Sequence, residues 1–71
     1  MAVEVRAELA SNVGAVLIVP GDQVKKCQTL IIVESMKMEI PVTAEVSGTV
    51  IEVRVEERDP VNEGDIVAVI N

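Results

Sequence analysis

The first half of the chain contains three short stretches with β-type patterns. Residues 3–8 place apolar side chains two positions apart with charged ones between them, which predicts a half-buried antiparallel strand. A mostly β-branched run over residues 15–19 predicts a second strand, which ends at the turn signal Pro20-Gly21-Asp22. Residues 30–33 are apolar throughout, which indicates a strand that is covered on both faces or buried in a small barrel.

The second half continues with the same kind of pattern. Strand character resumes at residues 40–44, where Pro41 lacks the N–H that a ladder needs, so this strand is expected at a sheet edge or with a local irregularity. Residues 48–55 form the longest predicted strand and residues 66–70 the last one. Because no segment carries a helical period, the chain is expected to be all-β.

The two halves resemble each other in sequence. Gly14 aligns with Gly48 and Val16 with Val50 at an offset of 34 residues. After a three-residue insertion, further pairs align at an offset of 37 residues: Asp22 with Asp59, Val24 with Val61, Gln28 with Asp65, Leu30 with Val67 and Ile32 with Val69. This order predicts two equivalent β halves related by a pseudo-dyad, with residues 34–39 between them as a hairpin tip.

The composition supports a β fold and excludes several classes of function. Val and Ile supply 22 of the 71 residues, and their branched side chains pack well on a pleated surface. The chain has no His and one Cys, which excludes His-dependent nucleophilic catalysis, a zinc site and an intrachain disulfide. The length predicts a single domain over residues 1–71.

The charge and hydropathy patterns narrow the possible partners and compartment. The net charge of −6 and the absence of aromatic residues argue against nucleic-acid and anionic membrane partners. No apolar run approaches the roughly 20 residues of a membrane span, and the start of the chain lacks a signal-peptide pattern. We therefore expect a cytoplasmic protein.

Residues 34–39 carry the candidate chemistry. The segment contains none of the Asn, Gly or Asp residues that usually form a hairpin turn, and it places two apolar thioethers, Met36 and Met38, at the tip. In one interpretation both Met side chains close the end of a barrel and Lys37 is an ordinary surface ammonium. In the other, Lys37 stands clear of the body and bears an attached group that does the chemistry, added by a separate modifying enzyme.

The segment Glu-Ser-Met-Lys-Met-Glu-Ile-Pro, residues 34–41, resembles the attachment motif of the biotinyl/lipoyl domain family. It is most similar to the short, free-standing biotinylated proteins of bacteria. Residues 48–50 and 62–65 match further family positions, so the resemblance covers nearly the whole chain. It implies a flattened barrel-sandwich hybrid of two four-stranded antiparallel sheets, with pseudo-twofold symmetry and the modified lysine on a hairpin tip.

The resemblance also implies a role for each residue of the tip. Lys37 is expected to be biotinylated through its ε-amine by a biotin protein ligase, which reads the flanking Met36 and Met38. Glu34 and Glu39 are the adjacent acids. Covalent biotin would accept a carboxyl group at a biotin carboxylase subunit and deliver it at a carboxyltransferase subunit. The protein itself is then a monomeric carrier and not an enzyme.

Two positions depart from the family pattern, and two alternative functions stay open. Cys27 and Arg58 stand where the family commonly has turn glycines, so a positive φ there would cost roughly 1–2 kcal/mol. The chain also lacks the inserted thumb of some biotin carrier domains. A lipoyl carrier would use the same Lys37, although lipoyl domains usually place an acid before the lysine and a small residue after it. An unmodified β-module would use Met36 and Met38 only as contacts for a partner.

Overall fold

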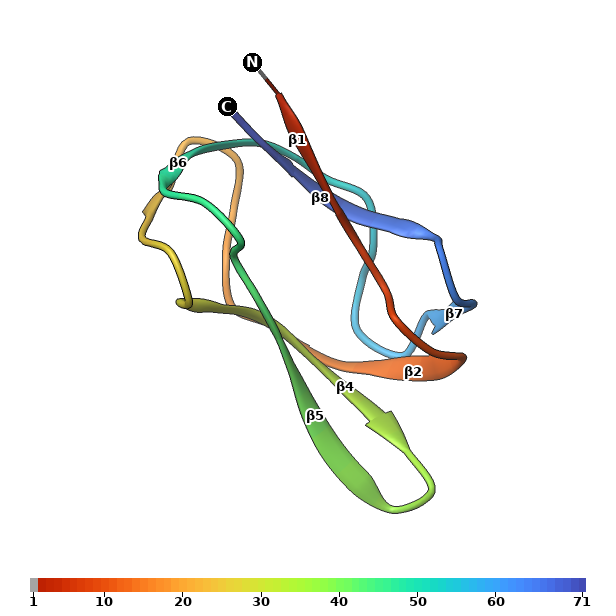
Figure 1. The fold of residues 1–71 in the computed structure, drawn as a ribbon. Coiled ribbons are helices and arrows are strands. Elements are labelled where there is room, and N and C mark those ends of the chain that lie inside the picture. Colours follow the sequence, from red (N-terminus) through yellow and green to blue (C-terminus); the bar gives the residue numbers. More distant parts are fainter. Residues whose placement is uncertain (1) are drawn as a thin grey trace.

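The computed structural model describes residues 2–71, and this part of the chain forms eight β-strands and no helix (Figure 1). The strands are β1 (Val3–Arg6), β2 (Ser11–Val16), β3 (Gln23–Val24), β4 (Thr29–Ser35), β5 (Met38–Thr43), β6 (Gly48–Val53), β7 (Pro60–Val61) and β8 (Ile66–Ile70). All of the strand pairs are antiparallel.

The strands form two four-stranded sheets, with the orders β1-β8-β6-β3 and β5-β4-β2-β7. This confirms the predicted all-β architecture of two antiparallel sheets. Pro41 lies in β5, which is an edge strand as predicted, so its missing N–H leaves no central ladder position empty. Val3 of β1 pairs with Ile70 of β8, so the two chain ends lie side by side, at the opposite end of the molecule from the β4–β5 hairpin (Figure 1).

The core consists of small aliphatic side chains from both sheets. Residues 30–33 supply three of its most buried members, Leu30, Ile31 and Val33, at 0 to 1% exposure. The strand β8 is buried almost along its whole length, with Val67, Ala68 and Ile70 at 0%. No polar side chain in residues 2–71 is buried, so the hydrophobic effect acts here without a polar desolvation cost.

Three details of the strand prediction are wrong. Residues 48–55, predicted as the longest strand, form the six-residue β6 that ends at Val53, and the seven-residue β4 is longer. The strand predicted over residues 15–19 instead spans Ser11–Val16, because Ser11 and Asn12 pair with β7 while Leu17 and Val19 lie outside the strand and are more than half exposed. The short strands β3 and β7 were not predicted, because two residues are too few to show a period.

Backbone hydrogen bonds reveal the pseudo-twofold repeat directly. Each backbone hydrogen bond that holds a turn of the first half has an equivalent in the second half. The donor of the equivalent bond lies 37 residues later in the chain, and its acceptor lies 37 residues earlier. The matching bonds are Gly21 N to Val50 O and Arg58 N to Val13 O, both 2.7 Å, and Cys27 N to Ala44 O and Gly64 N to Ala7 O, at 2.7 and 2.8 Å.

The predicted three-residue insertion is therefore wrong, since one offset of 37 relates the two halves throughout. The predicted alignment matched Gly14 to Gly48, but the structure requires a small residue at these two positions for different reasons. A Cβ on Gly48 would lie 2.7 Å from the carbonyl oxygen of Asn71, so only glycine fits there. A Cβ on Gly14 would lie 3.3 Å from Cγ of Glu34, which is a close contact with the hairpin.

Four turn residues of the body adopt left-handed backbone conformations, and they form two equivalent pairs. Gly21 has a φ of 99° and its counterpart Arg58 has 75°, while Cys27 has 73° and its counterpart Gly64 has 89°. The departure expected at Cys27 and Arg58 is thus a real backbone constraint. Four side chains hydrogen-bond these turns by accepting from the N–H three residues earlier: Asp22 from Val19, Gln28 from Lys25, Asp59 from Glu56 and Asp65 from Asn62, at 2.8 to 3.0 Å.

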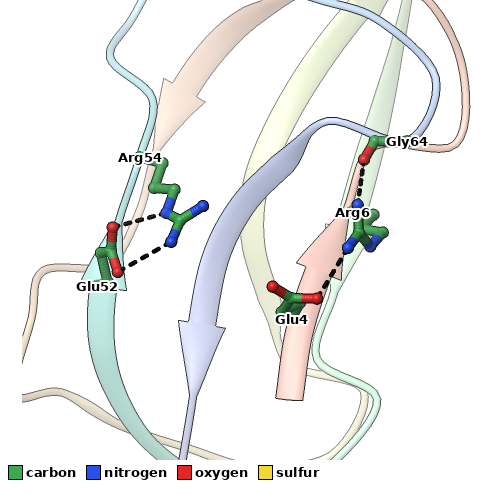
Figure 2. A network of polar contacts seen from close by, with 5 residues as sticks. All are labelled: Glu4, Arg6, Glu52, Arg54 and Gly64. Atoms are coloured by element: carbon green, nitrogen blue, oxygen red, sulfur yellow. Dashed lines mark hydrogen bonds and ion pairs between the residues drawn. The ribbon is translucent and has the colours of Figure 1, made fainter. Parts of the chain in front are cut away.

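Charged pairs flank β8 on the outer face of its sheet (Figure 2). Arg6 donates to Glu4 at 2.8 Å and to the Gly64 carbonyl at 2.7 Å, both from the β1 side. On the β6 side Arg54 donates to Glu52 at 2.6 Å, and this hydrogen bond raises the pKa of Arg54. These pairs are half exposed and contribute little to stability as charges.

Candidate functional site

The hairpin of β4 and β5 carries the candidate site away from the body of the fold (Figure 1). Its ladder closes with Ser35 opposite Met38, which leaves Met36 and Lys37 as a two-residue turn. The predicted hairpin tip is therefore confirmed. The antiparallel ladder runs without a register shift from Ser35 and Met38 back to Ile31 and Val42, and this fixes the position of the turn.

The backbone of the turn is left-handed at both central residues. The φ of Met36 is 51° and that of Lys37 is 65°, which is the signature of a type I′ hairpin turn. Such turns strongly prefer Asn-Gly, and a residue with a larger side chain held there costs on the order of 1 kcal/mol. Met36 and Lys37 are therefore not the residues that best stabilise this turn.

All three residues of the Met-Lys-Met motif are exposed. Met36 is 92% exposed and Met38 is 63% exposed, and Lys37 is exposed between them. The ion pairs within residues 2–71 use Arg6 and Arg54 as their cations, not Lys37. The interpretation in which the two Met side chains close the end of a barrel is wrong, because neither packs against the core.

The two faces of the hairpin differ in charge near its tip. Glu34 and Glu39 lie directly opposite each other on neighbouring strands, and both are exposed. Like charges in this arrangement are destabilising. Because side chains alternate along a strand, Met38 and Ile40 lie on the other face, toward the second sheet. The structure thus brings all five predicted site residues together, with the acids on one face and Met38 on the other.

The chemistry available at the tip is that of a single primary amine. Within residues 2–71 no group of three or more potential ligand side chains is placed to hold a metal ion. In the same part of the chain no titratable side chain is buried, so no general base is held in a protected site. Lys37 can serve as a point of covalent attachment, and the group that it carries would supply the reactivity.

The sequence pattern does not predict a groove that lies beside the hairpin. This groove has a volume of about 140 Å³ and lies between the edge strands β1 and β5. Its apolar lining comes from Val5, Ala7, Leu9, Val33, Ile40 and Val42. The alternation of Met38, Ile40 and Val42 on one face of β5 is the signal in the sequence, but only the structure shows that the β1 edge lies opposite.

Nearly the whole chain is similar to a known protein family. The family profile described as "Biotin-requiring enzyme", the biotin/lipoyl family, matches residues 3–70. The chain is 48% identical over 71 residues to a "Biotinylated protein TB7.3 homolog" of Mycobacterium leprae, with 100% of both chains covered. It is 49% identical over 63 residues to a "Biotin/lipoyl attachment protein" of Bacillus subtilis, which covers 89% of this chain and 86% of that one.

A similar fold also occurs inside a much larger protein. The Kluyveromyces lactis urea carboxylase superposes on 100% of this chain with a TM-score of 0.94 and 34% identity. The matching part is 6% of that carboxylase. Among residues 2–71 there is no helix long and apolar enough to cross a membrane. The family match, which spans almost every residue, and the shared fold show that this chain belongs to the biotin/lipoyl attachment family.

Proposed function

We propose that the protein is a biotin carrier and that Lys37 is its attachment point. The observation that carries this proposal is the exposed type I′ turn, whose left-handed residues are Met36 and Lys37 where a purely structural turn would have Asn-Gly. In this proposal the unfavourable turn sequence is kept at an exposed tip because its side chains serve recognition or attachment.

Each residue of the tip has a role in this proposal. A biotin protein ligase would join Nζ of Lys37 to the activated carboxyl carbon of biotin as an amide, while the bond to the activating group breaks and this group and a proton are released. When bound, biotin accepts a carboxyl group at one site and releases it at another. Met36 and Met38 offer the ligase soft apolar contacts, and Met36 is the more exposed of the two. Glu34 and Glu39 form an acidic face that suits a partner with basic side chains there.

The hairpin provides position and reach instead of catalysis. The ladder of β4 against β5 holds the turn in place, while the lysine side chain and the chain of biotin extend beyond it. The proposed partners are the ligase and the biotin carboxylase and carboxyltransferase subunits of a biotin-dependent carboxylase, as the likeness to urea carboxylase suggests. We further propose that the protein acts as a monomer in the cytoplasm.

A lipoyl carrier is the second candidate function. It is favoured by one finding, the similarity to a Bacillus subtilis protein that is described as attaching either group. The same exposed Lys37 would bear lipoate through the same type of amide. The residues on both sides of Lys37 are Met, and this pattern belongs to the biotinyl branch of the resemblance, so biotin is the primary proposal.

The test is the intact mass of the protein purified from its native cell, together with avidin blotting. We expect a mass increase of one biotinyl group, an avidin signal, and loss of both in Lys37→Arg. The double variant Lys25→Arg/Lys26→Arg is the matched control, because these are the other two lysines of the chain and both are exposed. A lipoyl mass would replace the primary proposal with the second candidate, and an unmodified mass would leave only a binding module.

A further inference from the structure

The groove between β1 and β5 lies on the same face of β5 as a side chain next to the tip of the hairpin. On β5 the side chains of Met38, Ile40 and Val42 share one face, because no bulge interrupts this part of the strand. Ile40 and Val42 pack against the core and line the groove, while Met38 lies beyond its end and is 63% exposed. An apolar track therefore leads from the turn that holds Lys37 into the groove.

The dimensions of the groove suit one ring system. Its volume of about 140 Å³ is similar to that of an engineered cavity of about 150 Å³ that takes up benzene. The lining also includes Glu8, Glu45 and Thr43, whose side-chain oxygens can accept hydrogen bonds. A fused ring with an apolar thioether side and a urea side with two N–H donors matches this combination of apolar and acceptor residues.

A group on Lys37 can reach the groove without any change in the backbone. Ile40 lies three residues along β5 from the lysine, a distance of about 10 Å at roughly 3.3 Å per residue. A lysine side chain joined to biotin extends over roughly ten single bonds, or about 12 Å from Cα to the ring. The attached ring would thus arrive at the end of the groove that is lined by Ile40 and Val33.

A peptide strand fits this groove less well than a ring does. Strand addition to a sheet edge requires a row of N–H donors, and Pro41 on the β5 edge has none. Two charged residues, Arg6 and Glu8, line the groove on the side opposite β5, which also disfavours edge-to-edge pairing with a second copy. These features favour a small tethered occupant over a macromolecular one.

We propose that the groove between β1 and β5 is a docking site for the ring of the biotin carried on Lys37. The inference rests on the proposed function, since it requires biotin on that lysine. Docking withdraws the ring from solvent between encounters with the partner subunits, and Met38 guides it along the track. A short tether gives an effective concentration on the order of 1 mM, so a ring that binds with a Kd of about 1 mM is docked for about half of the time.

The direct test is an isotope-filtered NMR experiment on the biotinylated protein. The chain is labelled with carbon-13 at its methyl groups and loaded with unlabelled biotin by a biotin protein ligase. We expect nuclear Overhauser contacts between ring protons and the methyl groups of Leu9, Ile40 and Val42. Free biotinamide at millimolar concentration, added to the unloaded protein, should shift the same methyl signals.

A matched pair of variants tests the consequence of docking. Leu9→Ser removes an apolar wall of the groove, and Val46→Ser changes the pseudo-equivalent residue 37 positions later, which does not line the groove. Avidin should capture the loaded protein about twofold more slowly than a biotinylated peptide. Leu9→Ser should restore the faster capture and Val46→Ser should not, with thermal midpoints measured for both variants to establish that they are folded.

The possible failures are distinguishable. If the mass shows biotin on Lys37 but the ring contacts only Met36 and Met38, the docking site is excluded and the carrier function stands. If no biotin is attached to Lys37, the proposed function fails and the docking site with it. If the NMR signals of the groove's methyl groups shift with protein concentration in the unloaded chain, the groove binds a second copy of the protein. That result would also overturn the proposal.

Discussion

The turns of the body and the turn at the hairpin tip use the same left-handed backbone with different residues. Each half of the body has one glycine and one larger residue at its two left-handed positions, in opposite order: Gly21 and Cys27 in the first half, Arg58 and Gly64 in the second. The tip has Met36 and Lys37 and no glycine. Body turns also have acceptor side chains that hold their backbone, such as Asp22 and Asp59.

The comparison distinguishes turn residues that stabilise the fold from turn residues that are kept for binding or attachment. In the body, either member of an equivalent pair can be glycine, because the same hydrogen bond to the opposite half is present with glycine and with the larger residue. At the tip, the ladder of β4 and β5 imposes the conformation, and the side chains are free to serve another purpose. Substitutions in each class of turn should therefore change stability in predictable directions.

The largest effect is expected from replacing the body glycines. Gly21→Ala and Gly64→Ala should each lower the free energy of unfolding by about 1–2 kcal/mol, because an L-residue is strained at these φ values. No atom lies within 4 Å of the added Cβ at either position, so the loss comes from backbone conformation and not from a clash. Urea unfolding followed by circular dichroism measures the loss in the free energy of unfolding. An unchanged midpoint would show that alanine is not strained at these positions.

A smaller loss is expected from the side chains that hold the turns. Asp22→Ala and Asp59→Ala should each cost about 1 kcal/mol, because the N–H groups of Val19 and Glu56 lose their acceptors at 3.0 and 2.9 Å. The two losses should be equal within error, since the turns are equivalent. Thermal unfolding of both variants tests this. Strongly unequal losses would show that the two turns are equivalent in structure but not in their contribution to stability.

A gain is expected where the body turns lack glycine. Cys27→Gly and Arg58→Gly should each raise the free energy of unfolding by about 0.5 kcal/mol, since relief of left-handed strain exceeds the added entropy of the unfolded chain. Differential scanning calorimetry can resolve the change. Loss of stability in both variants would mean that the left-handed conformation is not strained at these turns.

The smallest change in stability is expected at the tip. Met36→Asn should raise stability by a few tenths of a kcal/mol, because Asn tolerates the first position of a type I′ turn. The same variant should slow biotinylation in a ligase assay. For the change in stability, Met38→Asn is the control, because this residue lies in β5 and gains nothing from a turn preference. A Met36→Asn protein that is modified at the normal rate would exclude Met36 as a ligase contact.

Much of the fold and the position of the site could be predicted from the sequence. The β-branched runs indicated the longer strands, and the motif around Lys37 indicated the tip. The repeat offset was partly wrong, because identical glycines at positions 14 and 48 outweighed the less visible match between buried Val13 and Val50. The groove could not be predicted, since it depends on two edge strands that are 37 residues apart and meet only in the folded chain.

The placement of the chain ends has a practical consequence. Val3 and Ile70 pair near the two chain ends, at the end of the molecule opposite to the β4–β5 hairpin (Figure 1). A partner fused through a flexible linker to either end, or a surface to which an end is fixed, would leave the lysine facing outward. The same arrangement makes the domain a candidate tag for immobilising other proteins in a uniform orientation.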